Sequence, residues 1–441
     1  MGNSVGWGEQ GVPLSRSGGT VVQVARENSE DSMADSEVAN RIEEVGADFH
    51  ADPQRYYRRW RESGPVHRVR LADGVDGWVI IGYAEGRAAL NDPRLRKSAA
   101  EVYEIFDRRR DSGVVANAET QALAEHMLNT DPPDHTRLRK LVVKAFTPRR
   151  TAALRPRIEE ISAALLDEMA RHDEVDLLEA FANPLPVTVI CELLGVPFED
   201  RSDFQAWTRV LVGSVGGIQD RNVASVAMSE YLRKLVAAKR LEPGEDLLSD
   251  LVHVRDAGDR LSESELVAMV FLLLVAGHET TVNLIGNGTY ALLRNRSQLE
   301  ALRADPAAVP AAVEEFLRYD GPVGWATVRY TAEPVRIGGI DIPAGELVYV
   351  SLAAGNHDPA RYRAPDSLDI AGDPSGHLAF GHGIHFCVGA PLARLEAEIA
   401  FTALLRRFPD LSLAQPEFAP RWHHGALIRG LEELPVRLRE N

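Results

Sequence analysis

Cysteine is scarce in this chain of 441 residues, which contains only Cys191 and Cys387. The two cysteines lie in dissimilar surroundings, and this argues against the disulfide framework of a small secreted protein. Cys191 stands in the apolar helical context "VTVICELLGVP", so we interpret it as a core residue. The scarcity of cysteine favours a reducing, cytoplasmic location.

Basic residues are outnumbered, with 49 Lys and Arg against 65 Asp and Glu and a formal net charge of -16. This balance argues against nucleic acid or an anionic membrane as the main partner. Aromatic residues make up only 7% of the chain, but 45% of it is apolar, which is enough to bury a large core.

The beginning of the chain lacks an apolar run long enough for a signal peptide or a membrane anchor. Residues 1–40 are instead rich in glycine, serine and acidic residues. Such a stretch buries too little apolar surface to offset the entropy of ordering. We therefore expect a disordered tail over residues 1–40, followed by one soluble domain over residues 41–441.

The periodicity of the remaining chain predicts a mainly helical protein. Alternation and turn residues predict a hairpin over 64–83, and three- and four-residue spacing of apolar residues predicts helices over about 84–320. The pattern then favours strands over 325–352, and a long irregular stretch leads to a helix over 391–408. A last strand is expected in "LEELPVRLRE", so small β regions should lie near each end of the chain.

The segment "FGHGIHFCVG", which begins at Phe380, is the most informative part of the sequence. Gly381, Gly383 and Gly389 surround Cys387, and an amphipathic helix follows from about Pro391. Glycine allows sharp turns and close approach to a ligand. A cysteine before a helix N-terminus gains thiolate character from the helix dipole and from free N–H groups. These features favour a reactive or ligating sulfur over a buried structural one.

This segment resembles the haem-binding signature of the cytochrome P450 family, in which Phe, Gly, Gly, His or Arg, Cys and Gly recur at these spacings. The similarity extends from about residue 45 to the C-terminus. It implies the triangular-prism fold of that family around a buried haem b, with Cys387 as the thiolate ligand of the iron. Phe380, Gly381, His385 and Gly389 would complete the haem-binding loop.

Residues 262–294 form a long apolar run that predicts a central buried helix, roughly 48 Å long at about 1.5 Å per residue. Its middle reads "AGHETT", with small residues at Ala276 and Gly277 that leave room for a flat cofactor and a diatomic ligand. Glu279 and Thr280 then form an acid–alcohol pair. A threonine in a helix can bond back to the carbonyl four residues earlier and open a groove.

By resemblance, Glu279 and Thr280 correspond to the proton-delivery site of the family. Thr280 would hold water at the oxygen site, and Glu279 would relay protons from solvent. His278 is assigned no role, because its neighbours indicate that it points away from the haem.

Haem propionates are anions that need cationic or hydrogen-bonding partners. His135 and Arg139 stand four residues apart in "DHTRLRKL", so they share one helix face. The resemblance implies that both bind the propionates, together with Arg329 of the strand "TVRYTA" and with His385.

The residues Glu315 and Arg318 in "EEFLRY" are three apart on a helix. The resemblance implies a buried pair that fixes the loop leading to the cysteine, usually with a second arginine from that loop. The position expected for this arginine reads Ser367-Leu368, so we expect Arg361 or Arg363 to substitute for it.

Substrate contacts are expected from residues 105–125, 207–218, 321–327 and the turn near 425. An apolar wall above the haem would be formed by Val323, Trp325, Ala326 and Leu427. The sequence resembles actinobacterial enzymes that tailor polyketides, including macrolides.

A basic group on an acidic protein is a plausible docking site for an acidic ferredoxin. Such a group follows Arg139 along the chain and consists of Arg137, Lys140, Lys144, Arg149 and Arg150. A solvated helix face is an equally good interpretation of it. The chain has no flavin or iron–sulfur motif, so electrons must come from separate proteins, a ferredoxin and its reductase.

The resemblance therefore implies an NAD(P)H-driven monooxygenase that inserts one oxygen atom from O2 into an apolar substrate. One alternative is a peroxygenase that uses hydrogen peroxide, a class that usually lacks the acid–alcohol pair. Another is a non-catalytic haem-binding sensor, which needs no proton relay.

Overall fold

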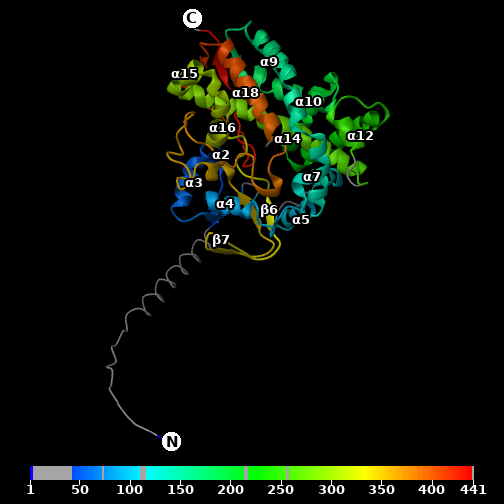
Figure 1. Ribbon diagram of the computed structural model, residues 1–441, viewed down its shortest axis with the longest axis vertical. Coiled ribbons are helices and arrows are strands. Elements are labelled where there is room, and N and C mark those ends of the chain that lie inside the picture. Colours follow the sequence, from blue (N-terminus) through cyan, green and yellow to red (C-terminus); the bar gives the residue numbers. More distant parts are fainter. Residues whose placement is uncertain (3–41, 72–73, 110–115, 213–216, 255–257, 440–441) are drawn as a thin grey trace, which may run out of the picture.

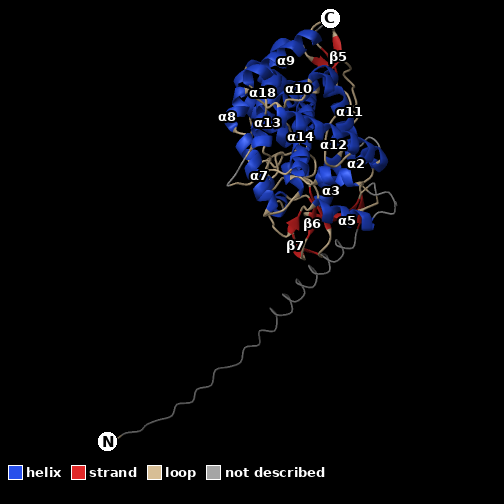
Figure 2. Ribbon diagram, turned by 90° about the vertical axis from the view of Figure 1, so that its right-hand side faces the viewer, coloured by secondary structure: helices blue, strands red, loops and turns tan. Residues whose placement is uncertain are grey.

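A computed structural model describes residues 1–2, 42–71, 74–109, 116–212, 217–254 and 258–439. Nearly all of the expected tail over residues 1–40 lies outside the described residues. Helices dominate the fold, and the strands gather at two ends of the molecule (Figures 1 and 2).

The helical segments are α2 (Ala47–Ala51), α3 (Pro53–Arg61), α4 (Tyr83–Ala89), α5 (Ala99–Arg109), α6 (Ala118–Ala124), η1 (Met127–Asn129), α7 (Asp134–Ala145), α8 (Pro148–Ala153), α9 (Arg155–Met169), η2 (Leu178–Ala182), α10 (Pro184–Leu194), η3 (Phe198–Asp200), α11 (Arg201–Val212), α12 (Ile218–Leu241), α13 (Leu247–His253), α14 (Glu263–Arg294), α15 (Arg296–Ala304), η4 (Pro306–Ala308), α16 (Val309–Asp320), α17 (Leu352–Asn356), η5 (Gly383–His385) and α18 (Ala390–Arg407). The strands are β1 (Ile42–Glu44), β2 (Val66–Arg70), β3 (Asp76–Ile80), β4 (Leu95–Arg96), β5 (Glu174–Asp176), β6 (Arg329–Thr331), β7 (Val335–Ile337), β8 (Ile340–Ile342), β9 (Leu347–Val350), β10 (Ser412–Leu413) and β11 (Pro435–Arg437).

The main sheet has the strand order β1-β2-β3-β9-β6-β4. The predicted hairpin over 64–83 is confirmed as the antiparallel pair β2–β3. The predicted strands over 325–352 are confirmed as β6 to β9. The expected mainly helical fold with small β regions is confirmed, and β3 pairs in parallel with β9, so the hairpin and the strands over 325–352 belong to one sheet. Each residue of β9 is buried, because this strand lies in the middle of the sheet between β3 and β6.

The predicted terminal strand is confirmed as β11, which pairs with β10 and β5. Figure 2 shows β5 at the end of the molecule opposite to β6 and β7. The C-terminal segment therefore closes the helical end of the fold.

The long helix expected over 262–294 is confirmed as α14, which runs through the middle of the helical region (Figure 1). Ser262 caps it, because its side chain accepts from the Glu265 N–H while the Glu265 carboxylate accepts from the Ser262 N–H. By length and composition α14 is also apolar enough to cross a membrane, but 61% of its most apolar window is buried inside the fold. That burial is the mark of a core helix.

The pair Glu315–Arg318 is buried in α16, where two bonds of 2.7 Å join the guanidinium to the carboxylate. Arg318 also donates to the carbonyls of Pro365 (2.8 Å) and Ser367 (3.0 Å), and the Asp369 N–H donates to Glu315 (2.8 Å). The expectation that Arg361 or Arg363 binds this pair is therefore wrong. Backbone groups of residues 365–369 satisfy the pair in its place.

The two candidate arginines of that loop lie elsewhere. Arg361 donates to the Ser375 carbonyl at 2.6 Å and lies over the ring of Tyr362, while Arg363 is exposed. The Asp369 N–H donates to the Glu315 carboxylate as a second arginine would, so the loop is anchored without that charge.

We expect Glu315→Ala to lower the free energy of unfolding by about 3–5 kcal/mol, because it leaves the Arg318 guanidinium buried without its carboxylate. Urea denaturation followed by circular dichroism measures this change. Asp341→Ala serves as the control, since it breaks an exposed pair with Arg336 that contributes about 1 kcal/mol or less. Equal losses in both variants would contradict the structural role of the buried pair.

Candidate active site

Cys387 stands in a tight loop between η5 and α18. The loop is closed by hydrogen bonds from the Cys387 N–H to the Phe380 carbonyl (3.0 Å) and from the Phe386 N–H to the Gly383 carbonyl (3.1 Å). Gly383 has φ +76°, and a Cβ there would lie 2.8 Å from the Asn91 side chain, so a larger residue is excluded. The loop holds the sulfur of Cys387 in the wall of an internal cavity.

The environment of the sulfur acts on its pKa in two directions. Burial raises the pKa of the Cys387 thiol, and this effect outweighs the opposing ones. The N–H groups of Gly389 and Ala390 and the charges of Arg139 and Arg394 lower it. The predicted influence of the helix N-terminus is therefore present but insufficient. A metal ion at the sulfur would remove the cost of burial, because a coordinating thiol is deprotonated.

The cavity has a volume of about 640 Å³ and a mainly apolar lining. It collects residues from segments far apart in the sequence, including α7, α14, the β6 region and the cysteine loop. Among the residues predicted from the sequence, the following line it: Arg139, Ala276, Gly277, Glu279, Thr280, Val323, Ala326, Arg329, Phe380, Gly381, His385, Cys387, Gly389 and Leu427.

The wall formed by α14 contains the groove that the sequence suggests. The Thr280 hydroxyl donates to the Ala276 carbonyl at 2.9 Å, which is the back-bonding expected of a helical threonine. Gly277 has a second reason to be small, since a Cβ there would lie 2.8 Å from the Ile190 side chain of α10. Close packing of α10 against α14 therefore also requires glycine at this position.

His278 is turned away from this groove. Its ring is buried, contacts Phe204 edge-on and bonds to the Leu274 carbonyl at 2.9 Å. Burial lowers the pKa of His278, so the imidazole stays neutral. Its Nε2 lies 3.5 Å from the Glu279 carboxylate, and it does not line the cavity. This geometry agrees with the assignment of no role.

Cationic and imidazole side chains gather at one side of the cavity. His385 lines it, and the His135 ring lies 4.3 Å from the His385 ring with neither of its own buried ring nitrogens hydrogen-bonded. Burial lowers the pKa of Arg329 to about 10. Burial and the neighbouring cations lower that of His385 to about 2. Arg139 completes the group at the cavity wall.

Lys97 belongs to this group and was missed by the sequence reasoning. It is buried, and its ammonium donates to the Thr327 hydroxyl at 2.6 Å, while Arg329 donates to the Thr327 carbonyl at 3.0 Å. Burial, followed by the charge of Arg329, lowers the pKa of Lys97 well below its ordinary value. In "PRLRKSA" Lys97 follows two arginines and looks like a surface residue, so the sequence does not indicate that Lys97 lines a buried site.

Asp131 is the acid that opposes these charges. Its carboxylate accepts from the N–H groups of Lys97 (3.0 Å) and Ser98 (3.1 Å), and its charge raises the pKa of Arg329. One carboxylate does not balance Lys97, Arg139 and Arg329. The cluster therefore fits a ligand that brings two further carboxylates, as haem does with its propionates. Together with the sulfur of Cys387 in the same cavity, these residues fit a haem group.

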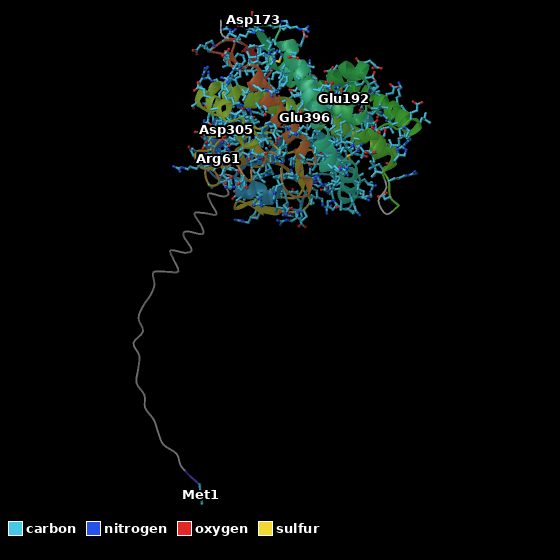
Figure 3. The ribbon with its side chains drawn as sticks, turned by 45° about the horizontal axis from the view of Figure 1, so that its top comes forward. Met1, Arg61, Asp173, Glu192, Asp305 and Glu396 are labelled. Atoms are coloured by element: carbon cyan, nitrogen blue, oxygen red, sulfur yellow. The ribbon has the colours of Figure 1, made fainter. Side chains whose placement is uncertain are left out.

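Two other polar residues of the cavity were not predicted. His126 is buried, its Nδ1 has no hydrogen-bond partner, and burial lowers its pKa to about 3. Glu396 comes from α18, in the middle of the molecule (Figure 3), and one of its oxygens has no partner. Burial raises the pKa of Glu396 well above its ordinary value, so it is a neutral acid.

The expected apolar wall is formed by Val323, Ala326 and Leu427 but not by Trp325. The segment over 321–327 meets the turn near 425 through the bonds of Gly324 N–H to the Leu427 carbonyl (3.0 Å) and of Trp325 N–H to the Ala426 carbonyl (2.9 Å). This pairing brings Leu427 beside Val323.

Trp325 instead lies in the core, where it is 1% exposed and donates to the Tyr57 hydroxyl at 2.7 Å. It borders a smaller neighbouring cavity. Val323 and Trp325 form isolated bridges to different partners, Ile428 and Ser351, so the segment does not continue as one regular strand between them.

The remaining segments expected to contact substrate contribute in part. From residues 105–125, Thr120, Leu123 and Ala124 line the cavity, and from 207–218 Leu211 does. Residues 110–115 and 213–216 of these segments lie outside the described residues.

Comparisons with known proteins agree with this geometry. The family model described as cytochrome P450 matches residues 79–214 and 219–426. The chain is 56% identical over 390 residues to cytochrome P450 107B1 of Saccharopolyspora erythraea, covering 88% of this chain and 96% of that protein. It is 51% identical over 398 residues to the cytochrome P450 monooxygenase PikC of Streptomyces venezuelae, covering 90% and 93%. It is also 45% identical over 393 residues to 6-deoxyerythronolide B hydroxylase of Saccharopolyspora erythraea, covering 88% and 97%.

A solved structure is similar over the same region. The tirandamycin C-bound P450 monooxygenase TamI superposes with a TM-score of 0.83 at 48% identity, covering 90% of this chain and 100% of that one. The motif around Cys387, the cavity beside it and these similarities lead to one conclusion: this chain belongs to the cytochrome P450 family and is a haem-dependent monooxygenase.

Proposed function

We propose that this enzyme hydroxylates or epoxidises an apolar secondary metabolite of the polyketide or macrolide class, with O2 and with electrons from a ferredoxin. The observation that carries the proposal is the cavity of about 640 Å³, which has an apolar lining and contains both Cys387 and the Glu279–Thr280 pair. A relative is named for hydroxylation of 6-deoxyerythronolide B, and TamI holds tirandamycin C. Both names support a bulky substrate of this class.

The chain's own residues would hold the cofactor. When bound, haem b supplies the iron at which O2 is activated, with electrons that come ultimately from NAD(P)H through separate redox proteins. We assign Cys387 as the sulfur ligand. We assign Arg139, Arg329, His135 and His385 to the haem carboxylates, and the buried Lys97 joins them.

We assign proton delivery to Glu279 and Thr280. The Thr280 hydroxyl already donates to the Ala276 carbonyl, so its oxygen is free to accept a hydrogen bond from water in the cavity. The side chain of Glu279 is 25% exposed, which suits a group that exchanges protons with solvent and passes them toward Thr280. A peroxygenase or a haem-binding sensor has no need of this pair.

We propose that the face of α7 binds the electron donor. Arg139 of this helix donates to the Phe386 carbonyl at 2.7 Å, so α7 directly touches the cysteine loop. Lys140, Lys144 and Arg149 are exposed on or beside it. Arg137 and Arg150 contribute less, because Arg137 is paired with Asp259 and Glu265 and Arg150 with Asp250. The exposed basic side chains on this face suit an acidic ferredoxin.

We further propose that residues 41–441 act as a single domain in the cytoplasm. The parallel pair β3–β9 ties the first part of the chain to its last third, and both cysteines are free thiols. Size-exclusion chromatography of the purified chain and limited proteolysis test the single domain.

We expect the reduced protein to show a thiolate-type absorption band with carbon monoxide, and we expect Cys387→Ser to abolish that band. The reason is that the serine hydroxyl does not supply the same electron density to iron. Cys191→Ala is the matched control, since this buried cysteine lies in the core and should leave the band in place. Retention of the band in Cys387→Ser would exclude the assigned ligand.

We expect Thr280→Ala to bind haem and substrate normally but to form roughly tenfold less hydroxylated product per NAD(P)H, with the excess recovered as hydrogen peroxide. The physical reason is the loss of the hydroxyl that holds water in the α14 groove. Product and peroxide are quantified in the same reaction. Thr289→Ala, on the same helix but outside the cavity lining, should keep the wild-type ratio. An unchanged ratio in Thr280→Ala would remove the relay assignment.

We expect macrolides and linear polyketides to shift the spectrum of the ferric protein more strongly than small aromatics, because the cavity is large and apolar. Compounds that bind are then tested for turnover with a surrogate ferredoxin and reductase, and in parallel with hydrogen peroxide. Product only with peroxide would favour the peroxygenase. Binding without product in either reaction would favour the sensor.

A further inference from the structure

A half-buried carboxylate, that of Glu314, adjoins the Glu315–Arg318 pair in the sequence but has different partners. Glu314 of α16 accepts two bonds from Arg394 of α18, at 2.5 Å from Nε and 2.8 Å from Nη2. It also accepts from His377 Nε2 at 3.0 Å. The other ring nitrogen of His377 accepts from the Ala379 N–H at 3.2 Å, so His377 is a neutral donor to Glu314.

Glu314 remains charged in this network. Burial raises the pKa of its carboxyl, but the bonds from Arg394 and His377 outweigh burial and lower the pKa to about 2. The Arg394 side chain is 34% exposed and that of Glu314 is 29% exposed, so solvent screens the two charges only in part. The positive charge of Arg394 is therefore held in place and partly cancelled by one fixed carboxylate.

The same arginine reaches the cysteine loop. Its guanidinium lies 4.5 Å from the centre of the Phe380 ring, and the Phe380 carbonyl accepts the N–H of Cys387. Arg394 also stands in the first turns of α18, the helix whose leading N–H groups bond to the Cys387 sulfur. Arg394 therefore contacts the cysteine loop from the start of the helix that follows it.

We propose that Arg394 and Glu314 set the electron donation of the Cys387 sulfur to the iron, with Arg394 withdrawing charge and Glu314 limiting that withdrawal. A nearby cation stabilises electrons on a thiolate and weakens its donation, and groups around an axial ligand tune the potential of a haem. The inference rests on the proposed ligation by Cys387. It makes Arg394 and Glu314 positioning residues, because neither acts on the substrate.

The contacts of the two cations at the loop support this proposal. Arg394 lies against the Phe380 ring of the cysteine loop and is fixed there by two bonds to Glu314. Arg139 also reaches the loop, at the Phe386 carbonyl, but we assign its charge to the haem carboxylates. Arg394 is therefore a cation at the loop whose charge an acid of the chain itself offsets.

A purely structural brace predicts a different result. If the Glu314–Arg394 pair only held the loop in place, removal of either partner would loosen it in the same manner. Electrostatic tuning requires opposite effects, because one variant leaves an uncancelled positive charge and the other removes it.

The test compares Glu314→Gln and Arg394→Met in the haem-loaded full chain. We expect Glu314→Gln to raise the reduction potential and the C–O stretching frequency of the carbon monoxide complex, because the sulfur donates less. We expect Arg394→Met to lower both, and Arg394→Lys and the double variant to stay close to the wild type. Spectroelectrochemistry and infrared spectroscopy measure these shifts without turnover.

Arg109 and Glu346 provide a matched control pair. They also form a two-bond, half-buried ion pair, at 3.2 Å and 3.0 Å, but neither lines the cavity. Glu346→Gln and Arg109→Met should leave the potential unchanged.

Shifts of the same sign in Glu314→Gln and Arg394→Met, or no shift in Glu314→Gln, would overturn the proposal. Should Arg394→Met fail to bind haem, Glu314→Gln and Arg394→Lys decide the question, since the first must shift upward and the second must not. A wild-type protein without a thiolate-type band would instead refute the ligation by Cys387, so the two failures are distinguishable.

Discussion

Charge buried without its counter-charge is the constraint on which this site depends. Lys97, Arg139 and Arg329 meet at one cavity with Asp131 as the opposing acid, and the Cys387 sulfur faces the same space with a pKa raised by burial. Each of these groups costs free energy when it is desolvated alone. A metal bound to the sulfur and an anionic cofactor bound to the cations would offset both costs together. These residues are therefore complementary to a flat, dianionic, iron-containing ligand.

The rest of the fold holds this arrangement by anchoring loops to helices. Arg318 binds the backbone carbonyls of Pro365 and Ser367, and Glu314 binds Arg394, so α16 fixes both the approach to the cysteine loop and the start of α18. In the first of these networks, the Asp369 N–H donates to Glu315 in place of a second arginine. The consequence is that the loop is held by a single buried ion pair, while the second pair remains available for electrostatic tuning.

Different parts of α14 have different surroundings. Its ends and its outer faces pack in the core, whereas the turn from Ala276 to Thr280 opens toward the cavity through the bond of the Thr280 hydroxyl to the Ala276 carbonyl. Glu279 is placed next to this opening, while His278 is turned into the core. Under the proposed function, selectivity for substrate would depend on segments from other parts of the chain, such as those of Val323 and Leu427.

The sequence by itself determined the cysteine loop, the central helix with Glu279 and Thr280, and the hairpin over 64–83, because each depends on local spacing, turn residues and a specific motif. Only the tertiary structure decided the partners of groups distant in sequence. It joined β3 to β9, gave the Glu315–Arg318 pair backbone partners instead of Arg361 or Arg363, buried Trp325 against Tyr57, and brought Lys97 into the cationic cluster. The physical reason is that burial and hydrogen bonding at these positions are set by segments distant in the sequence, and no periodicity around Lys97 or Trp325 records which segment that is.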